Sequence, residues 1–245
     1  MAREWYDTVA NIVGDATVEL GLKSTAIADP YGSTDPNILQ LLALLKSLGQ
    51  DLVRDHPWQA LETTHTFATV SGTAAYDPPA GFGRMRNQTE WDRTGQTPLL
   101  GPVSGVGWQL LKAQTSTGTV EFLMRVFNDQ LNLHPTPTSI KTIAFEYISR
   151  YWVRATASSA PDKEAPTVAS DVIHLDRRMV VAGLKWKWKR EKGFDSAAAD
   201  QDFRDAYGRA QSMDGSAPTL DTVSPQLHFG RMLDQSNMPD TNYGS

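Results

Sequence analysis

The chain has 245 residues, of which 40% are hydrophobic and 21% charged, and its net charge is −5. This composition is ordinary for a folded protein, in one large domain or two small ones, and it excludes a disordered or fibrous chain. The negative charge excludes a bulk attraction to nucleic acid or anionic membranes, and the lack of cysteine excludes disulfides, thiolate catalysis and Cys-ligated zinc.

The N-terminus lacks the features of a signal peptide. It carries acids at Glu4, Asp7 and Asp15 and has no long apolar core. No uninterrupted apolar run approaches the roughly 20 residues that a membrane helix needs. We therefore expect no membrane contact, and a protein made in the cytoplasm.

Two helices are predicted in the first quarter of the chain. Apolar residues at helical spacing predict a helix over residues 4–20, with Gly21 as its C-terminal cap. A second helix should begin at Asp35, whose carboxylate can cap the first turn, and should stop at Pro57. Its leucines lie on more than one side, which predicts burial between neighbouring elements.

Alternating residues then predict β structure. Residues 64–70 and 73–79 flank the turn Ser71-Gly72 and should form a hairpin. A second hairpin is expected around the turn Asn128-Asp129.

The longest strand signal covers residues 141–155. It places Ile143, Phe145 and Tyr147 on one face.

Helical spacing returns after the polar loop 156–170. One helix is predicted from Val172 through the basic run 185–192, with Gly193 closing it, and a last helix over residues 196–213.

The predicted fold class is α+β: a discontinuous helical bundle with an inserted antiparallel β domain and an extended C-terminal arm. Residues 1–62 plus 169–213 should form the helical bundle domain. Residues 63–168 should form the inserted β domain, and residues 214–245 the extended C-terminal docking arm.

The stretch HPWQALETTHTF, residues 56–67, contains two histidines that could suggest a metal or a catalytic site. No carboxylate stands at ligand spacing from His56 or His65, and no HExxH motif is present. We favour a joint where the bundle becomes the β domain, with Trp58 packed in the bundle base. No catalytic or metal-binding residue is assigned, and no cofactor is expected.

His174 offers a second chemical possibility. Asp171 and Asp176 flank it in a predicted helix, so a general-base pair is conceivable, but a solvated face or a subunit contact is the favoured interpretation. Residues 101–107 lack the G-x-S-x-G order of serine hydrolases and the patterns of phosphate loops.

The sequence KWKWKREK, residues 185–192, interleaves cations and aromatic rings. Such a pattern can bind nucleic-acid backbones. On a helix, however, Trp186 and Trp188 lie about 200° apart, so only one can face a given core. Packing is favoured, and Trp186 and Trp188 are candidates for a subunit interface.

The C-terminal segment from residue 214 onward is polar, with apolar residues too densely spaced for an idle linker. We predict a docking arm whose extended chain fits a partner's grooves. Its anchors would be Leu220, Val223, Leu227, Phe229, Met232, Leu233 and Met238.

Several landmarks occur in an order that resembles the head-to-tail adaptors of short-tailed bacteriophages, the group of tail tubular protein A-like proteins. These landmarks are HPWQALETTHTFAT, AAYDPPAGFGRM, NLHPTPTSIKTIAFEYISRYWV and DVIHLDRRMVVAGLKWKWKREKGFD. The resemblance covers residues 1 to about 213.

The resemblance implies a structural virion protein at the head–tail junction. No residues on which to place a catalytic activity are found in the sequence, so we expect no enzymatic activity. Twelve copies would form a ring, or connector, below the portal protein. The arm would reach the portal, and the β domain would face a tail nozzle or tail fibre protein. DNA would pass through a central channel during ejection without specific binding. The alternative hypothesis is a hydrolase acting on cell wall or nucleic acid.

Overall fold

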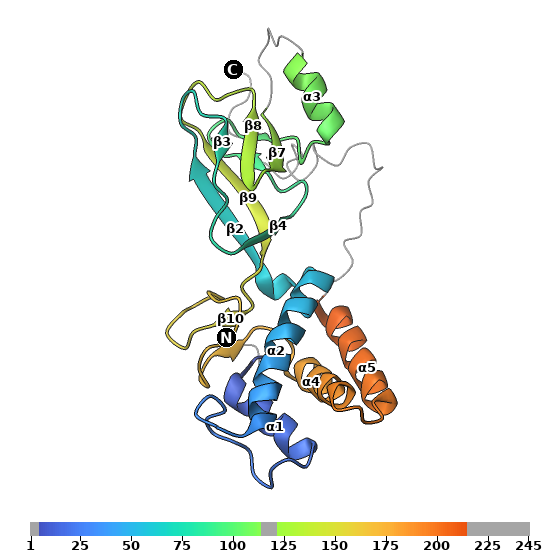
Figure 1. Ribbon diagram of the computed structural model, residues 1–245. Helices are drawn as coiled ribbons and strands as arrows, with labels where there is room; N and C mark the ends of the chain where they lie inside the picture. The colour runs from blue at the N-terminus through green and yellow to red at the C-terminus, as the bar shows by residue number, and fades with distance from the viewer. Residues whose placement is uncertain (1–4, 114–121, 215–245) are drawn as a thin grey trace, which may run out of the picture. The chain divides into compact units, whose positions relative to one another are not determined.

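The computed structural model describes residues 5–113 and 122–214. Within these residues the chain folds into helices and antiparallel sheets, as Figure 1 shows, and the predicted α+β class is confirmed. The predicted C-terminal arm lies outside the described residues, apart from Asp214.

Four helices from opposite ends of the described chain pack together (Figure 1). Helix α4 contacts the other three. The four are α1 (Val9–Glu19), α2 (Pro36–Asp55), α4 (Arg177–Glu191) and α5 (Ala197–Asp214).

Local sequence explains where these helices begin and end. The Asp35 side chain accepts a hydrogen bond from the Asn37 backbone N–H at 2.9 Å, and Pro36 fills the first turn of α2. Gly21 and Gly193 follow α1 and α4 with φ angles of 69° and 73°, the left-handed conformation that terminates helices. The boundaries predicted at Asp35, Gly21 and Gly193 are therefore confirmed. The predicted start of the first helix at residue 4 is wrong, because Asp7 and Thr8 pair with Ile173 and Val172 as a strand and α1 begins only at Val9.

The strands form three antiparallel sheets. The largest has the order β2 (Glu62–Ala68), β9 (Thr142–Ser149), β5 (Trp91–Asp92), β6 (Thr97–Pro98), with β4 (Phe82–Met85) also on β9. The second has the order β3 (Ala75–Tyr76), β8 (Gln130–His134), β7 (Leu123–Phe127). The third has the order β1 (Asp7–Thr8), β11 (Val172–Ile173), β10 (Val153–Arg154). Two short helices complete the described chain: η1 (Gln59–Leu61) and α3 (Gly105–Ala113).

Two separate hydrophobic cores hold these elements. The four packed helices share one core with Trp58, Trp152 and Ile148. The β core contains Leu99, Met124, Leu131, Leu133, Ile143, Phe145 and Tyr147. The predicted common face of Ile143, Phe145 and Tyr147 is thus confirmed, whereas Ile148 of the same strand packs in the helical core.

One predicted hairpin is wrong and the other is right. Strand β2 pairs along its whole length with β9, and β3 pairs with β8, so the segments on either side of Ser71-Gly72 do not pair with each other. The turn exists, since Gly72 has a φ of 81°, but its N–H donates to Pro137 O at 2.9 Å, in the segment before β9. Strands β7 and β8 do form the second hairpin, with φ of 54° at both turn residues.

The helix predicted from Val172 begins later than expected. Val172 and Ile173 form β11 between β1 and β10, and Asp176 caps α4 by accepting from the Met179 N–H at 2.8 Å. The predicted strand 141–155 is likewise divided, because β9 ends at Ser149 and β10 belongs to another sheet. Backbone pairing partners, which are distant in sequence, decide both boundaries.

Candidate functional site

Trp58 lies where helical structure changes to β structure. Its side chain is 4% exposed and packs in the helical core, and its indole Nε1–H donates to Leu52 O at 2.8 Å, at the end of α2. The chain then passes through η1 into β2. This position fits the joint predicted for residues 56–67.

The histidines of this stretch have different surroundings. His56 Nε2 lies 3.3 Å from Asp214 Oδ2 at the end of α5, and the His56 ring meets Trp58 edge to face. His65 stacks on Phe67, and burial lowers the pKa of its imidazole. No cluster of three metal-ligating side chains occurs in residues 5–113 or 122–214.

A cavity of about 190 Å³ opens beside this joint. Aromatic rings form much of its lining, and two carboxylates stand among them. The lining residues are Trp5, Tyr6, Trp58, Ala60, His174, Leu175, Asp176, Ala210, Met213 and Asp214. Residues from four distant parts of the chain therefore build one small pocket, which we call the aromatic pocket.

Backbone contacts fix the walls of the aromatic pocket. Trp5 O accepts a hydrogen bond from the Arg177 N–H at 2.9 Å, which attaches the N-terminal wall to α4. On the other side, both carboxylate oxygens of Asp214 accept from the Gln59 N–H, at 3.2 and 3.0 Å. The pocket is therefore preformed in the folded chain.

His174 belongs to this pocket and not to a helix. Its ring stacks on Tyr6 with centroids 4.6 Å apart, and Arg154 Nε donates to His174 Nε2 at 3.1 Å. Burial, and then the Arg154 charge, lower the pKa of His174 to about 4. The imidazole is therefore neutral at pH 7, with Nε2 as an acceptor.

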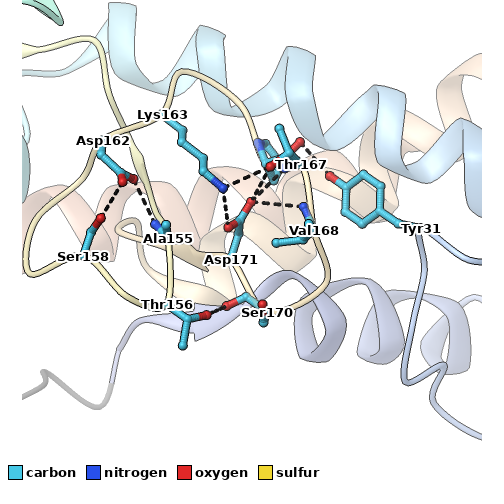
Figure 2. A network of polar contacts seen from close by, with 11 residues as sticks. Tyr31, Ala155, Thr156, Ser158, Asp162, Lys163, Thr167, Val168, Ser170 and Asp171 are labelled. Atoms are coloured by element: carbon cyan, nitrogen blue, oxygen red, sulfur yellow. Dashed lines mark hydrogen bonds and ion pairs between the residues drawn. The ribbon is translucent and has the colours of Figure 1, made fainter.

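His174 does not pair with Asp171, a pairing that the sequence left as conceivable but not favoured, because the Asp171 carboxylate is engaged elsewhere. Figure 2 shows its buried carboxylate accepting from Lys163 Nζ at 2.8 Å and from the N–H groups of Thr167 and Val168 at 2.8 and 3.1 Å. Burial alone would raise the pKa of Asp171, but these donors lower it below its ordinary value. Asp171 therefore orders the loop before β11.

The same loop has two further ties (Figure 2). Tyr31 Oη donates to Pro166 O at 2.7 Å, and burial raises the pKa of Tyr31 to about 12. Asp162 accepts from Ser158 Oγ at 2.5 Å and from the Ala155 N–H at 2.9 Å. The Asp162 contacts are local, whereas the Tyr31 hydrogen bond joins the loop to a segment 135 positions away, and both hold the loop in place.

Two of the four lysines of KWKWKREK make contacts between helices. Lys185 pairs with Glu19 of α1. Lys187, buried at 6% exposure, pairs with Asp51 of α2 at 2.6 Å. Because these two ammonium groups have carboxylate partners within the chain, fewer charges of this helix remain for phosphate groups.

The two tryptophans of this helix have different surroundings, as their spacing predicted. Trp188 is 6% exposed in the helical core and lies against Phe194. Trp186 is half-buried, stacks on Phe203 of α5 at 5.3 Å and lies under Arg190. Trp188 is thus packed within its own chain, and a subunit contact through either ring stays a prediction.

The predicted docking-arm residues, from Leu220 to Met238, lie outside the described residues. None of the helices in the described part is long and apolar enough to cross a membrane.

The chain belongs to the SU10 adaptor protein family, whose model matches residues 7–225, and this is a family of bacteriophage adaptors of the head-to-tail type. No curated protein matches the chain. The predicted adaptor family is confirmed at this level, and the closer likeness to tail tubular protein A stays a prediction.

Proposed function

We propose that the protein is a structural adaptor that joins the portal of a phage head to the tail. The observation that supports this proposal best is the family match, which spans both cores and the first part of the predicted arm. In this role the protein is not an enzyme, and it requires no cofactor.

The proposed assembly is a ring of twelve copies, the number that the resemblance implies. A closed ring needs two different complementary surfaces on each subunit. Exposed apolar side chains would contribute, since Leu39 of α2 is 50% exposed and Phe194, between α4 and α5, is 59% exposed. The half-buried Trp186 would add an aromatic edge to such a surface.

DNA passes through the proposed ring without specific binding. A net charge of −5 favours a lining that does not hold phosphate groups. The carboxylate partners of Lys185 and Lys187 further limit binding by the most basic helix.

Truncation after Asp214 tests portal docking by the arm. This boundary keeps the contacts of Asp214 with His56 and Gln59, so the truncated chain should keep its circular dichroism spectrum and thermal midpoint. It should no longer attach to portal-bearing particles in co-sedimentation.

A full-length variant shows whether attachment depends on the apolar side chains of the arm or only on the length of the chain. Serine at Leu227, Phe229, Met232 and Leu233 should abolish attachment as the truncation does. Alanine at the polar arm residues Ser224, Asn237 and Thr241 is the matched control and should leave it intact. Attachment that survives the serine variant would refute the docking arm.

A further inference from the structure

We infer that the aromatic pocket receives one cationic side chain, arginine or lysine, presented by a partner protein of the virion. The pocket joins aromatic surfaces, which attract cations through their ring faces, with two carboxylates. This inference rests on the proposed adaptor function for the identity of the partner.

The size of the pocket selects the class of ligand. A cavity of about 190 Å³ is smaller than the roughly 300–1,000 Å³ of sites for nucleotides, cofactors and drug-sized ligands. Its volume suits one long side chain. The Trp5 ring, at 48% exposure, offers aromatic surface in the pocket, whereas Trp58, at 4% exposure, is a buried part of the wall.

The charges around the pocket favour a cation. Asp176 uses Oδ1 to cap α4, and no hydrogen bond to its Oδ2 occurs within the described chain. Asp214 contributes the second carboxylate, with His56 beside it. His174 is neutral at pH 7, so its imidazole does not repel a cation that enters the pocket.

Two neighbouring cations are occupied by other contacts. Arg154 donates to His174 and to Ser158 O, and Arg177 pairs with Asp7 and Asp15. The described chain therefore places no arginine or lysine in the pocket lining.

The pocket also lies at the start of the predicted arm. Asp214, in its wall, is followed directly in the chain by residue 215. A partner that binds the first arm residues would therefore bring its own side chains near the pocket. Combined binding by pocket and arm would raise affinity through a high effective concentration.

The test uses the full chain and two small probes. N-acetyl-arginine amide is titrated against the isosteric but uncharged N-acetyl-citrulline amide, with NMR shifts of the tryptophan indole N–H groups as the readout. We expect saturable shifts with the arginine probe, and binding of the citrulline probe weaker by about three- to tenfold or more.

Matched variants locate the binding. Trp5→Ala and Asp176→Asn should each weaken arginine binding about three- to tenfold, and asparagine keeps the helix cap. The controls are Phe194→Ala, another exposed aromatic, and Asp195→Asn, whose side chain accepts from the Ala197 N–H at α5. Neither should change binding.

Equal binding of the two probes, no binding, or binding unaffected by Trp5→Ala would overturn the inference. These outcomes are distinguishable from failure of the adaptor proposal, since particle attachment of the arm variants is measured separately. If the chain binds the arginine probe but never attaches to particles, the inference about the pocket is supported and the adaptor role is refuted.

Discussion

Trp58 links the end of α2 to the helical core, and its removal should be costly. Trp58→Ala leaves a cavity and removes the donor to Leu52 O, so we expect a loss of about 3–5 kcal/mol in the free energy of unfolding. Trp5→Ala, at a half-exposed ring, should change it by less than about 1 kcal/mol. Urea denaturation measures both, and a small effect at Trp58 would contradict its packing role.

Glu90 is the buried acid without a partner. It is 1% exposed, and neither carboxyl oxygen has a hydrogen-bond partner within the described chain. Burial raises the pKa of Glu90 above its ordinary value of 4.5, and the nearby backbone N–H groups of residues 88–90 offset this only in part. The folded state therefore holds this proton more tightly than the unfolded state, so its contribution to stability is present below pH 4.5 and is lost as pH rises through the folded pKa.

Glu90→Gln should remove this dependence. We expect the variant to be more stable than the natural chain at pH 8, with a smaller difference at pH 4, in urea denaturation at each pH. Glu164→Gln, at a half-exposed acid paired with Arg150, is the control. A Glu90→Gln difference that stays constant between the two pH values would contradict the argument.

At the scale of the element, Gly49 shows how closely α2 approaches the segment after β9. A Cβ added at Gly49 would lie 2.2–2.6 Å from ring atoms of the fully buried Trp152. The helix propensity of alanine favours Gly49→Ala by about 1 kcal/mol, but overpacking a rigid ring costs about 1–3 kcal/mol or more. We therefore expect net destabilisation.

Gly208 provides the matched comparison within α5. Nothing lies within 4 Å of a Cβ added there. Gly208→Ala should therefore stabilise the chain by about 0.5–1 kcal/mol. Thermal denaturation of both variants checks the prediction, and a stable Gly49→Ala protein would show that Trp152 can move.

The contact between α2 and α4 depends on a buried lysine. Lys187 Nζ reaches Asp51 and also Ser47 Oγ at 2.9 Å. Asp51→Ala leaves the buried ammonium without its charged partner and should cost about 1–3 kcal/mol. Lys187→Met removes both the charge and the need for a partner, so it should be the milder change in urea denaturation. The reverse order would contradict this account.

The elements that could be predicted are those whose signals are local. The caps at Asp35 and Gly193 and the turn at residues 128–129 act within a few residues, and all were predicted. Strand pairing depends on distant partners. The alternating segment 64–70 pairs with β9, nearly 80 positions later. Nothing in its own sequence favours that partner over residues 73–79, which follow directly after the turn.

At the scale of the whole molecule, the same reasoning explains why the aromatic pocket was missed. Its walls come from residues 5–6, 58–60, 174–176 and 210–214, which no short motif unites. Trp58 and His174 were singled out in the sequence, but only the packing of α4 against α1, α2 and α5 brings them together. An aromatic residue beside an acid at several distant positions is too common a signal to predict a site.

The two cores should unfold as one cooperative unit, because β9 contributes to both. Ile148 packs in the helical core, whereas Phe145 and Tyr147 of the same strand pack in the β core. Leu45→Ala and Leu131→Ala delete equal groups from fully buried positions, one in each core, and each should cost about 2–5 kcal/mol.

Hydrogen exchange followed by mass spectrometry tests this cooperativity. In a single unit, Leu45→Ala lowers the protection of β8 as well as that of α4, since both open only in global unfolding. Leu131→Ala, in the β core, should likewise lower the protection of α4 as well as that of β8. Loss of protection confined to the mutated core would show that the two cores unfold independently. Strand β9 would then connect the cores without coupling their unfolding.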